Sequence, residues 1–155
     1  MPRWNTSPAA CRCTASTRRC KRGRPCWTRP GGLFDAEGAF FAIAAPVAPR
    51  AGEPVVEKAV PNAFAGTNLD AVLKDQGAKT LIVAGFMTHM CVSSTVRAGL
   101  DLGYACTVLA PACATRDLPD GGGGVVAAED LQRAELAALA DRFAMIATGL
   151  DQLAG

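Results

Sequence analysis

The second half of the chain alternates short apolar runs with segments of helical periodicity, and this pattern strongly constrains the fold. Residues 79–85 predict a buried strand, residues 91–102 a helix that ends at Gly103, and residues 104–110 the next strand. Strands that alternate with helices of ten or more residues are typical of right-handed crossovers and a mostly parallel sheet. We therefore predict an α/β fold, a three-layer α/β/α sandwich.

Further elements extend the pattern on both sides. A short strand is expected at residues 54–56, followed by a helix that Thr67 caps and Gly77 ends. Residues 111–124 predict a loop in which Arg116 and Asp117 form an ion pair, and residues 143–147 predict a last strand. Residues 127–142 predict an amphipathic helix. Its apolar face comprises Leu136, Leu139, Ala140 and Phe143.

Residues 1–30 differ in composition from the rest of the chain. They contain eight Lys and Arg, no Asp or Glu, and four cysteines: Cys11, Cys13, Cys20 and Cys26. The four thiols could ligate zinc, although paired C-x₂-C spacing is absent. An Arg-rich, acid-free segment could also be a transit peptide, although an apolar face is missing. We favour a third interpretation, an irregular head that is disordered or translated from the wrong frame of a GC-rich gene.

Residues 31–155 form the predicted folded domain, and their charge excludes several function classes. They contain the other eight Lys and Arg and all 14 acidic residues, which gives a net charge of −6. A mildly acidic body does not favour nucleic-acid binding. No apolar run approaches the roughly 20 residues that a membrane-spanning helix needs. Cys91, Cys106 and Cys113, without a secretory signal, indicate reduced thiols and a cytoplasmic protein.

Cys91 is the candidate nucleophile. It follows the predicted strand at residues 79–85 after a short turn and lies at the start of the next predicted helix. Backbone N–H groups and the helix dipole stabilise a thiolate at such a position. Open α/β sheets also bind their ligands at the carboxyl ends of the strands. The alternative is an inert buried cysteine, which is a common role for this residue type.

Three segments together resemble the isochorismatase-like cysteine hydrolases. They are GFMTHMCVSSTVRAGLDLGY at residues 85–104, VVEKAVPNAFAGTNLDAVL at residues 55–73, and ACATRDLPDGGGG at residues 112–124. The likeness covers roughly residues 33–148, with the motifs in the order and spacing of the family. It implies a three-layer sandwich and hydrolysis of a small amide, ureide or related C–N bond, without a metal or organic cofactor.

The resemblance also implies roles for individual residues. Cys91 would be the nucleophile and Lys58 the activating cation of a triad. The backbone amides of Met87 and Cys91 would form the oxyanion hole, with a cis peptide between Phe86 and Met87 to aim the first amide. His89, Phe64 and Phe86 would line the substrate pocket. Because the chain has a single histidine, we do not expect the metal site of nicotinamidase-like members. Lys58 could instead be a solvated lysine at a strand end.

The third triad member of the family, an Asp at the end of the first strand, has no counterpart in the sequence. The first acidic residue is Asp35, which we expect with Glu37 in a solvated loop. The family's first strand and following helix would fall within residues 1–30 or be lost. An inactive or truncated member that acts as a non-catalytic subunit is therefore the alternative function. A homo-oligomer and a small-molecule substrate are the expected partners.

Overall fold

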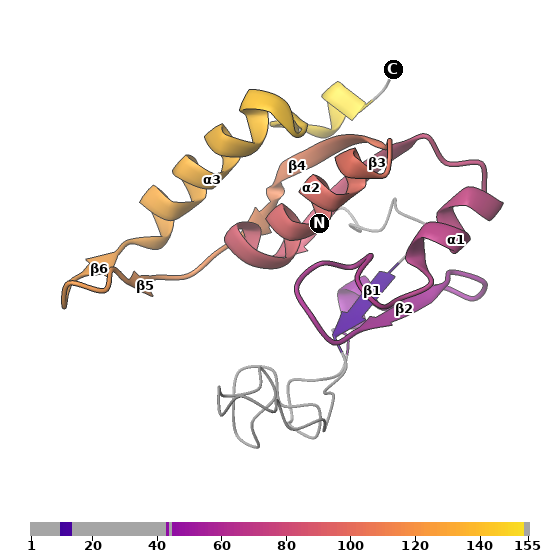
Figure 1. Ribbon diagram of the computed structural model, residues 1–155, viewed down its shortest axis with the longest axis horizontal. Coiled ribbons are helices and arrows are strands. Elements are labelled where there is room, and N and C mark those ends of the chain that lie inside the picture. Colours follow the sequence, from indigo (N-terminus) through magenta and orange to yellow (C-terminus); the bar gives the residue numbers. More distant parts are fainter. Residues whose placement is uncertain (1–9, 14–42, 44, 154–155) are drawn as a thin grey trace. The chain divides into compact units, whose positions relative to one another are not determined.

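The computed structural model describes residues 10–13, 43 and 45–153 (Figure 1). The chain divides into two compact units, residues 1–72 and residues 73–155. Each unit is built around parallel strand pairing. Asp35, Glu37 and most of residues 1–30 lie outside the described residues, so the interpretations of the head remain predictions.

The first unit contains a pair of parallel strands. Strand β1 (Ala10–Cys13) pairs with β2 (Val55–Lys58), from Ala10 opposite Val55 to Cys13 opposite Lys58. A short 3-10 turn, η1 (Ala45–Val47), precedes β2. The predicted strand at residues 54–56 is thus confirmed, and one strand falls within residues 1–30. Strand pairing uses only backbone groups, so β1 needs no apolar alternation to form.

Helix α1 (Leu69–Asp75) follows β2 and begins where the sequence predicts. The Thr67 hydroxyl accepts a hydrogen bond from the Leu69 N–H at 3.2 Å and donates to the Ala63 carbonyl at 2.5 Å. At the other end Gly77 adopts φ +67°, while the Ala78 N–H returns to the Leu73 carbonyl at 2.9 Å. A residue with positive φ at this position is the usual stop of a helix, which explains the glycine.

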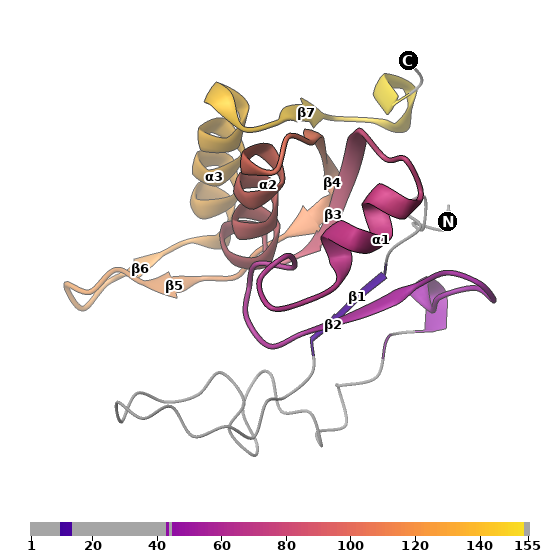
Figure 2. The same cartoon turned by 45° about the vertical axis from the view of Figure 1, so that its right-hand side comes forward.

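The second unit has a three-stranded parallel sheet in the order β3-β4-β7. Its strands are β3 (Thr80–Phe86), β4 (Ala105–Ala114) and β7 (Met145–Ala147). Helices α2 (Ser93–Asp101) and α3 (Ala128–Arg142) connect successive strands. They lie side by side on one face of the sheet (Figure 2). This is the α/β arrangement with parallel strands that the sequence predicts.

The core of the second unit lies between the two helices and the sheet. Val96 of α2, Val108 of β4 and Leu139 of α3 are each fully buried. The predicted apolar face of α3 is only partly correct, because Ala140 is exposed. Gln132 and Glu135, which are polar, lie on the partly buried side instead. The helix tolerates Glu135 there because Arg97 of α2 lies opposite it.

The predicted loop at residues 111–124 is wrong in part, because β4 continues to Ala114. Its register with β3 shifts between Val83, opposite Val108, and Gly85, opposite Cys113. Pro111 lies in the bulged segment between these pairs, where a missing N–H breaks no ladder bond. A short hairpin follows, made of β5 (Leu118–Pro119) and β6 (Val125–Val126), and η3 (Leu150–Leu153) comes after β7.

Asp117 also differs from the prediction. Its carboxylate accepts a hydrogen bond from the Ala128 N–H at 2.8 Å, at the start of α3. Arg116 donates to the Asp117 backbone carbonyl at 3.2 Å rather than to the carboxylate. A carboxylate at a helix N-terminus satisfies one of the N–H groups that lack an intrahelical partner. Asp117 therefore caps α3 from a distant point in the sequence.

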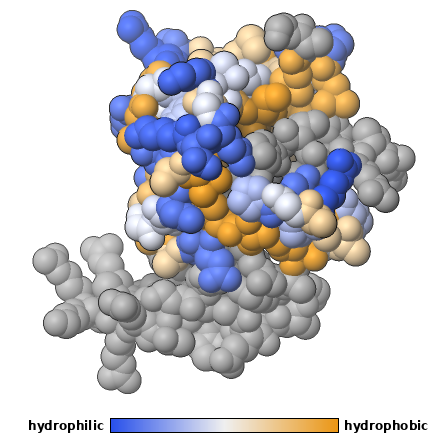
Figure 3. Space-filling view, turned by 90° about the vertical axis from the view of Figure 1, so that its right-hand side faces the viewer, coloured by the Kyte–Doolittle hydropathy of each residue, from blue (hydrophilic) through white to orange (hydrophobic). Residues whose placement is uncertain are grey.

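Several large hydrophobic side chains are exposed, among them Phe86 (71 %), Val125 (68 %) and Met145 (56 %). Figure 3 presents a face on which hydrophobic residues, in orange, reach the surface between hydrophilic residues, in blue. In the part of the chain that the structure describes, no helix is long and apolar enough to cross a membrane.

Candidate functional site

Cys91 lies in a π-helical turn, η2 (Thr88–Val92), between β3 and α2. We call residues 88–92 the cysteine turn. In this turn the Val92 N–H donates a hydrogen bond to the Met87 carbonyl at 3.3 Å, and the Ser93 N–H donates one to the Thr88 carbonyl. The sequence predicts a helix that starts at Cys91, whereas the α-helix starts at Ser93. One wide turn precedes it because these hydrogen bonds span five residues rather than four.

The turn carries the Cys91 side chain at the carboxyl end of β3, and Cys91 is partly exposed. Cys106 and Cys113 differ from it, since both are buried reduced thiols, as the sequence predicts. Burial raises the pKa of each of these two thiols. For Cys113 a hydrogen bond from the Gly85 backbone opposes that effect. Cys91 is therefore the most accessible of the three.

The Phe86–Met87 peptide bond is cis, as the resemblance implies. Met87 stands immediately before the cysteine turn in an extended conformation, with φ −97° and ψ 146°. Its carbonyl accepts hydrogen bonds from the N–H groups of Met90 and Val92. Both backbone amides of the predicted oxyanion hole, those of Met87 and Cys91, thus belong to one short segment. Phe86, at the end of β3, is largely exposed.

His89 of the cysteine turn hydrogen-bonds the Thr115 hydroxyl through Nδ1. Desolvation by burial lowers the pKa of His89, the positive charge of Arg116 lowers it further, and the carboxylate of Glu135 opposes them. Residues two apart in a helical turn do not face each other. His89 thus ties the cysteine turn to Thr115, just after β4. It does not face Cys91 and is not placed to take its proton.

Lys58 ends β2 in the first unit and is 6 % exposed. Its Nζ donates hydrogen bonds to the carbonyls of Val60, at 3.2 Å, and Pro61, at 3.1 Å. The alternative interpretation as a solvated lysine is therefore wrong. A buried ammonium requires such acceptors, because leaving it without them would cost several kcal/mol. Phe64 is partly buried in the same segment, and its N–H donates to Asn62 Oδ1 at 2.9 Å.

The predicted site residues are divided between the two units. Met87, His89, Cys91 and Phe86 come together in the second unit, and Lys58 and Phe64 in the first. The four residues of β1, Ala-Cys-Arg-Cys, include no carboxylate. The general base is therefore not found on this strand. Within the described residues, no group of three or more His, Cys, Asp or Glu side chains could hold a metal ion.

A second set of polar residues, which sequence reasoning missed, lies beside the cysteine turn. Arg97 bonds Ser93 and approaches Glu135, while the buried oxygen atoms Thr88 Oγ1 and Gln132 Oε1 have no hydrogen-bond partner in the described structure. One signal was present in the sequence, since Ser93 and Arg97 stand four residues apart on a predicted helix. Glu135 gave no such signal, because its partner is on another helix.

The chain belongs to the isochorismatase family: the isochorismatase domain matches residues 27–151. The isochorismatase family protein YddQ of Bacillus subtilis (strain 168) is 40% identical over 102 residues, which are 66% of this chain and 56% of that protein. The ureidoacrylate amidohydrolase RutB of Stutzerimonas stutzeri is 35% identical over 82 residues, 53% of this chain and 33% of that protein.

A solved structure is similar over most of the chain. The isochorismatase of Pseudomonas putida KT2440 has a TM-score of 0.76 and 38% identity, covering 90% of this chain and 64% of that one. The α/β fold with a parallel sheet is thereby established from both the strand pairing and the similarity. The chain spans about half the length of two curated relatives that it matches.

Proposed function

We propose that this protein is a cysteine-nucleophile hydrolase that cleaves a small amide or ureide C–N bond. The observation that carries the proposal is the position of Cys91, partly exposed in the turn that joins the carboxyl end of β3 to α2. Family membership supports it, and the similarity to a ureidoacrylate amidohydrolase supports the ureide substrate class. A screen of small amides and ureides would identify the substrate.

In the proposed reaction the Cys91 thiolate attacks the substrate carbonyl carbon, and a C–S bond forms. The carbonyl electron pair moves to oxygen, where the backbone N–H groups of Met87 and Cys91 stabilise it. One such donor is typically worth about 3–4 kcal/mol in serine proteases. Collapse of the intermediate breaks the C–N bond, and the leaving amine takes up the proton that the Cys91 thiol lost when it became a thiolate. Water then hydrolyses the thioester, which returns the thiol and releases the acid.

Lys58 supplies the cation in this proposal. A positive charge favours a cysteine thiolate over the thiol. The two carbonyl groups that accept from Lys58 Nζ fix its side chain at the end of β2. A residue held in this way keeps its position through a reaction cycle, which a solvated lysine does not.

The test is turnover of a panel of small amides and ureides by purified full-length protein. Cys91→Ser should abolish turnover, and Lys58→Met should lower it by about a hundredfold or more. Lys74→Met is the matched control, because Lys74 is an exposed lysine in α1, and it should retain wild-type turnover. Activity retained by the Cys91→Ser variant would overturn the mechanism.

A second candidate is an inactive member that serves as a non-catalytic subunit. The lack of a carboxylate in β1 favours it, since the family's base comes from the first strand. A wild-type chain that turns over no member of the panel, but restores or changes the activity of a related hydrolase when mixed with it, would support this candidate.

A further inference from the structure

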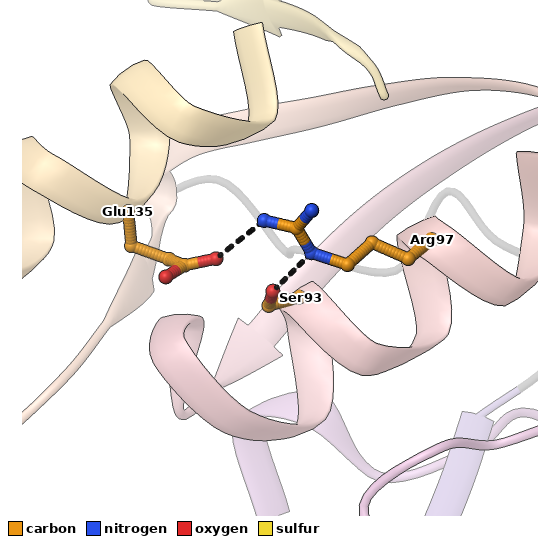
Figure 4. Close-up of polar contacts among 3 residues, drawn as sticks. All are labelled: Ser93, Arg97 and Glu135. Carbon is orange, nitrogen blue, oxygen red and sulfur yellow. Dashed lines mark hydrogen bonds and ion pairs between the residues drawn. The ribbon is translucent and has the colours of Figure 1, made fainter. Parts of the chain in front are cut away.

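Arg97 makes one contact within α2 and two with the region of α3, and Figure 4 shows the contacts with Ser93 and Glu135. Its Nε donates a hydrogen bond to Ser93 Oγ at 3.1 Å, and its Nη2 lies 3.6 Å from Glu135 Oε1. The guanidinium also stacks over the Phe143 ring, with Cζ 3.9 Å from the ring centroid. Such a planar cation can hydrogen-bond, pair with a carboxylate and stack at the same time, which a lysine cannot.

Ser93 is the link between these contacts and Cys91. It is the first residue of α2, and its N–H bonds back to the carbonyls of Thr88 and Met90 in the cysteine turn. Its side chain is buried and accepts from Arg97. The cysteine turn is thus fixed at its end through the backbone of Ser93, and Ser93 is fixed through its hydroxyl.

Glu135 is the second anchor, on α3. Its Oε1 is buried without a hydrogen-bond partner, and the positive charge of Arg97 Nη2, 3.6 Å away, compensates for its desolvation. The α3 helix also contacts the cysteine turn directly. Removing Arg97 would leave a carboxylate desolvated beside this turn, and water or a shift of the helix would have to compensate for it.

We propose that Arg97 is a positioning residue that holds the cysteine turn, and with it the Cys91 thiol, in place against α3. The proposal rests on the proposed function of Cys91 as a nucleophile. Arg97 acts through Ser93 and Glu135 and does not itself touch the substrate. Its role is to keep the geometry of the turn fixed, so that the thiol and the backbone amides of Met87 and Cys91 remain aligned.

The test compares Arg97→Met with Arg133→Met in the full-length chain. Arg133 is the matched control, because it pairs with Asp130 at 2.8 Å on the exposed surface of α3. The rate of alkylation of Cys91 by iodoacetamide is followed by mass spectrometry that resolves Cys91 from the other cysteines. Hydrogen exchange of residues 88–93 is measured on the same proteins, at a temperature where all remain folded.

Arg97→Met should speed hydrogen exchange in the cysteine turn and slow Cys91 alkylation by about tenfold, because a loosened turn no longer holds the thiolate at the start of the helix, where backbone N–H groups stabilise it. Arg133→Met should change neither quantity. Arg97→Lys should recover only part of the loss, because it keeps the charge without the planar fork. Equal alkylation and exchange in the Met variants at positions 97 and 133 would overturn the positioning role.

The two proposals fail in different ways. If wild-type Cys91 alkylates no faster than buried Cys106, the proposed function fails, whatever the variants do. In that case faster exchange in the turn of Arg97→Met alone would still support Arg97 as the residue that holds it. If wild-type Cys91 is reactive and Arg97→Met leaves both measurements unchanged, only the positioning proposal is overturned.

Discussion

His89 and Thr115 are joined by a hydrogen bond between Nδ1 and the hydroxyl, which connects the cysteine turn to the residue that follows β4. The pKa of His89 lies below its ordinary value of 6.5, first because burial removes water and then because Arg116 is positive. Glu135 has the opposite effect. The imidazole is therefore neutral at neutral pH, with Nδ1 committed to Thr115.

This arrangement predicts how the His89 pKa responds to charge changes. Glu135→Gln should lower it further, because the carboxylate that favours the protonated ring is removed, and Arg116→Gln should raise it. The chain has one histidine, so its imidazole resonance in an NMR titration needs no assignment. Arg133→Gln, at an exposed site on α3, is the control. A His89 pKa that stays unchanged in both test variants would contradict these assigned causes.

The same shift predicts a pH dependence of stability. A histidine whose pKa is lower in the folded state binds protons more readily in the unfolded state. His89 therefore contributes its full stability above about pH 6.5, and that contribution decreases as the pH falls toward the folded pKa. Urea unfolding at pH 7.5 and 5.5 measures it, and His89→Gln should remove this part of the difference. If the wild-type unfolding free energy changed between the two pH values no more than that of His89→Gln, the predicted contribution of His89 would be wrong.

Asp117 should stabilise α3 by capping it. Asp117→Ala removes the acceptor that the Ala128 N–H uses, and substitutions of this kind typically cost about 1 kcal/mol of unfolding free energy. Asp117→Asn keeps a side-chain oxygen and should lose only a fraction of this amount. Urea denaturation of the three proteins provides the comparison. Equal destabilisation by Ala and Asn would show that the capping hydrogen bond contributes little.

The parts of the fold that depend on local chemistry could be predicted from sequence. Thr67 and Gly77 mark both ends of α1 because a capping hydroxyl and a positive φ each need a particular residue type. The strand β3 could be predicted because a continuous apolar run bounded by turn residues is typical of buried parallel strands. Cys91 could be placed at the end of that strand for the same reason.

The parts that depend on distant contacts could not be predicted. In the π-helical turn before Ser93 each hydrogen bond spans five residues instead of the four of an α-helix. The hydrophobic periodicity of the sequence does not reveal this difference. The passage of β4 through Pro111 depends on a bulge opposite β3. Glu135 faces inward on α3 only because Arg97 comes from another helix. For β4 and Glu135 the partner that decides the structure is remote in sequence, whereas the π-helical turn is local but leaves no mark in the hydrophobic pattern.

We propose catalytic roles for both Lys58 and Cys91, and different observations support each role. Lys58 is buried and held by two carbonyls, and Cys91 is partly exposed at the end of a strand. Turnover by folded Lys58→Met and Cys91→Ser variants tests both roles: both changes should be severe, while Lys74→Met should be harmless.

The most direct measurement is the pH dependence of Cys91 alkylation in the wild-type chain, with buried Cys106 as the internal reference. Cys91 should react rapidly with iodoacetamide already at pH 6, where an ordinary thiol is almost fully protonated, while Cys106 stays slow. A Cys91 whose rate rises only above pH 8, in parallel with an ordinary thiol, would contradict its assignment as an activated nucleophile.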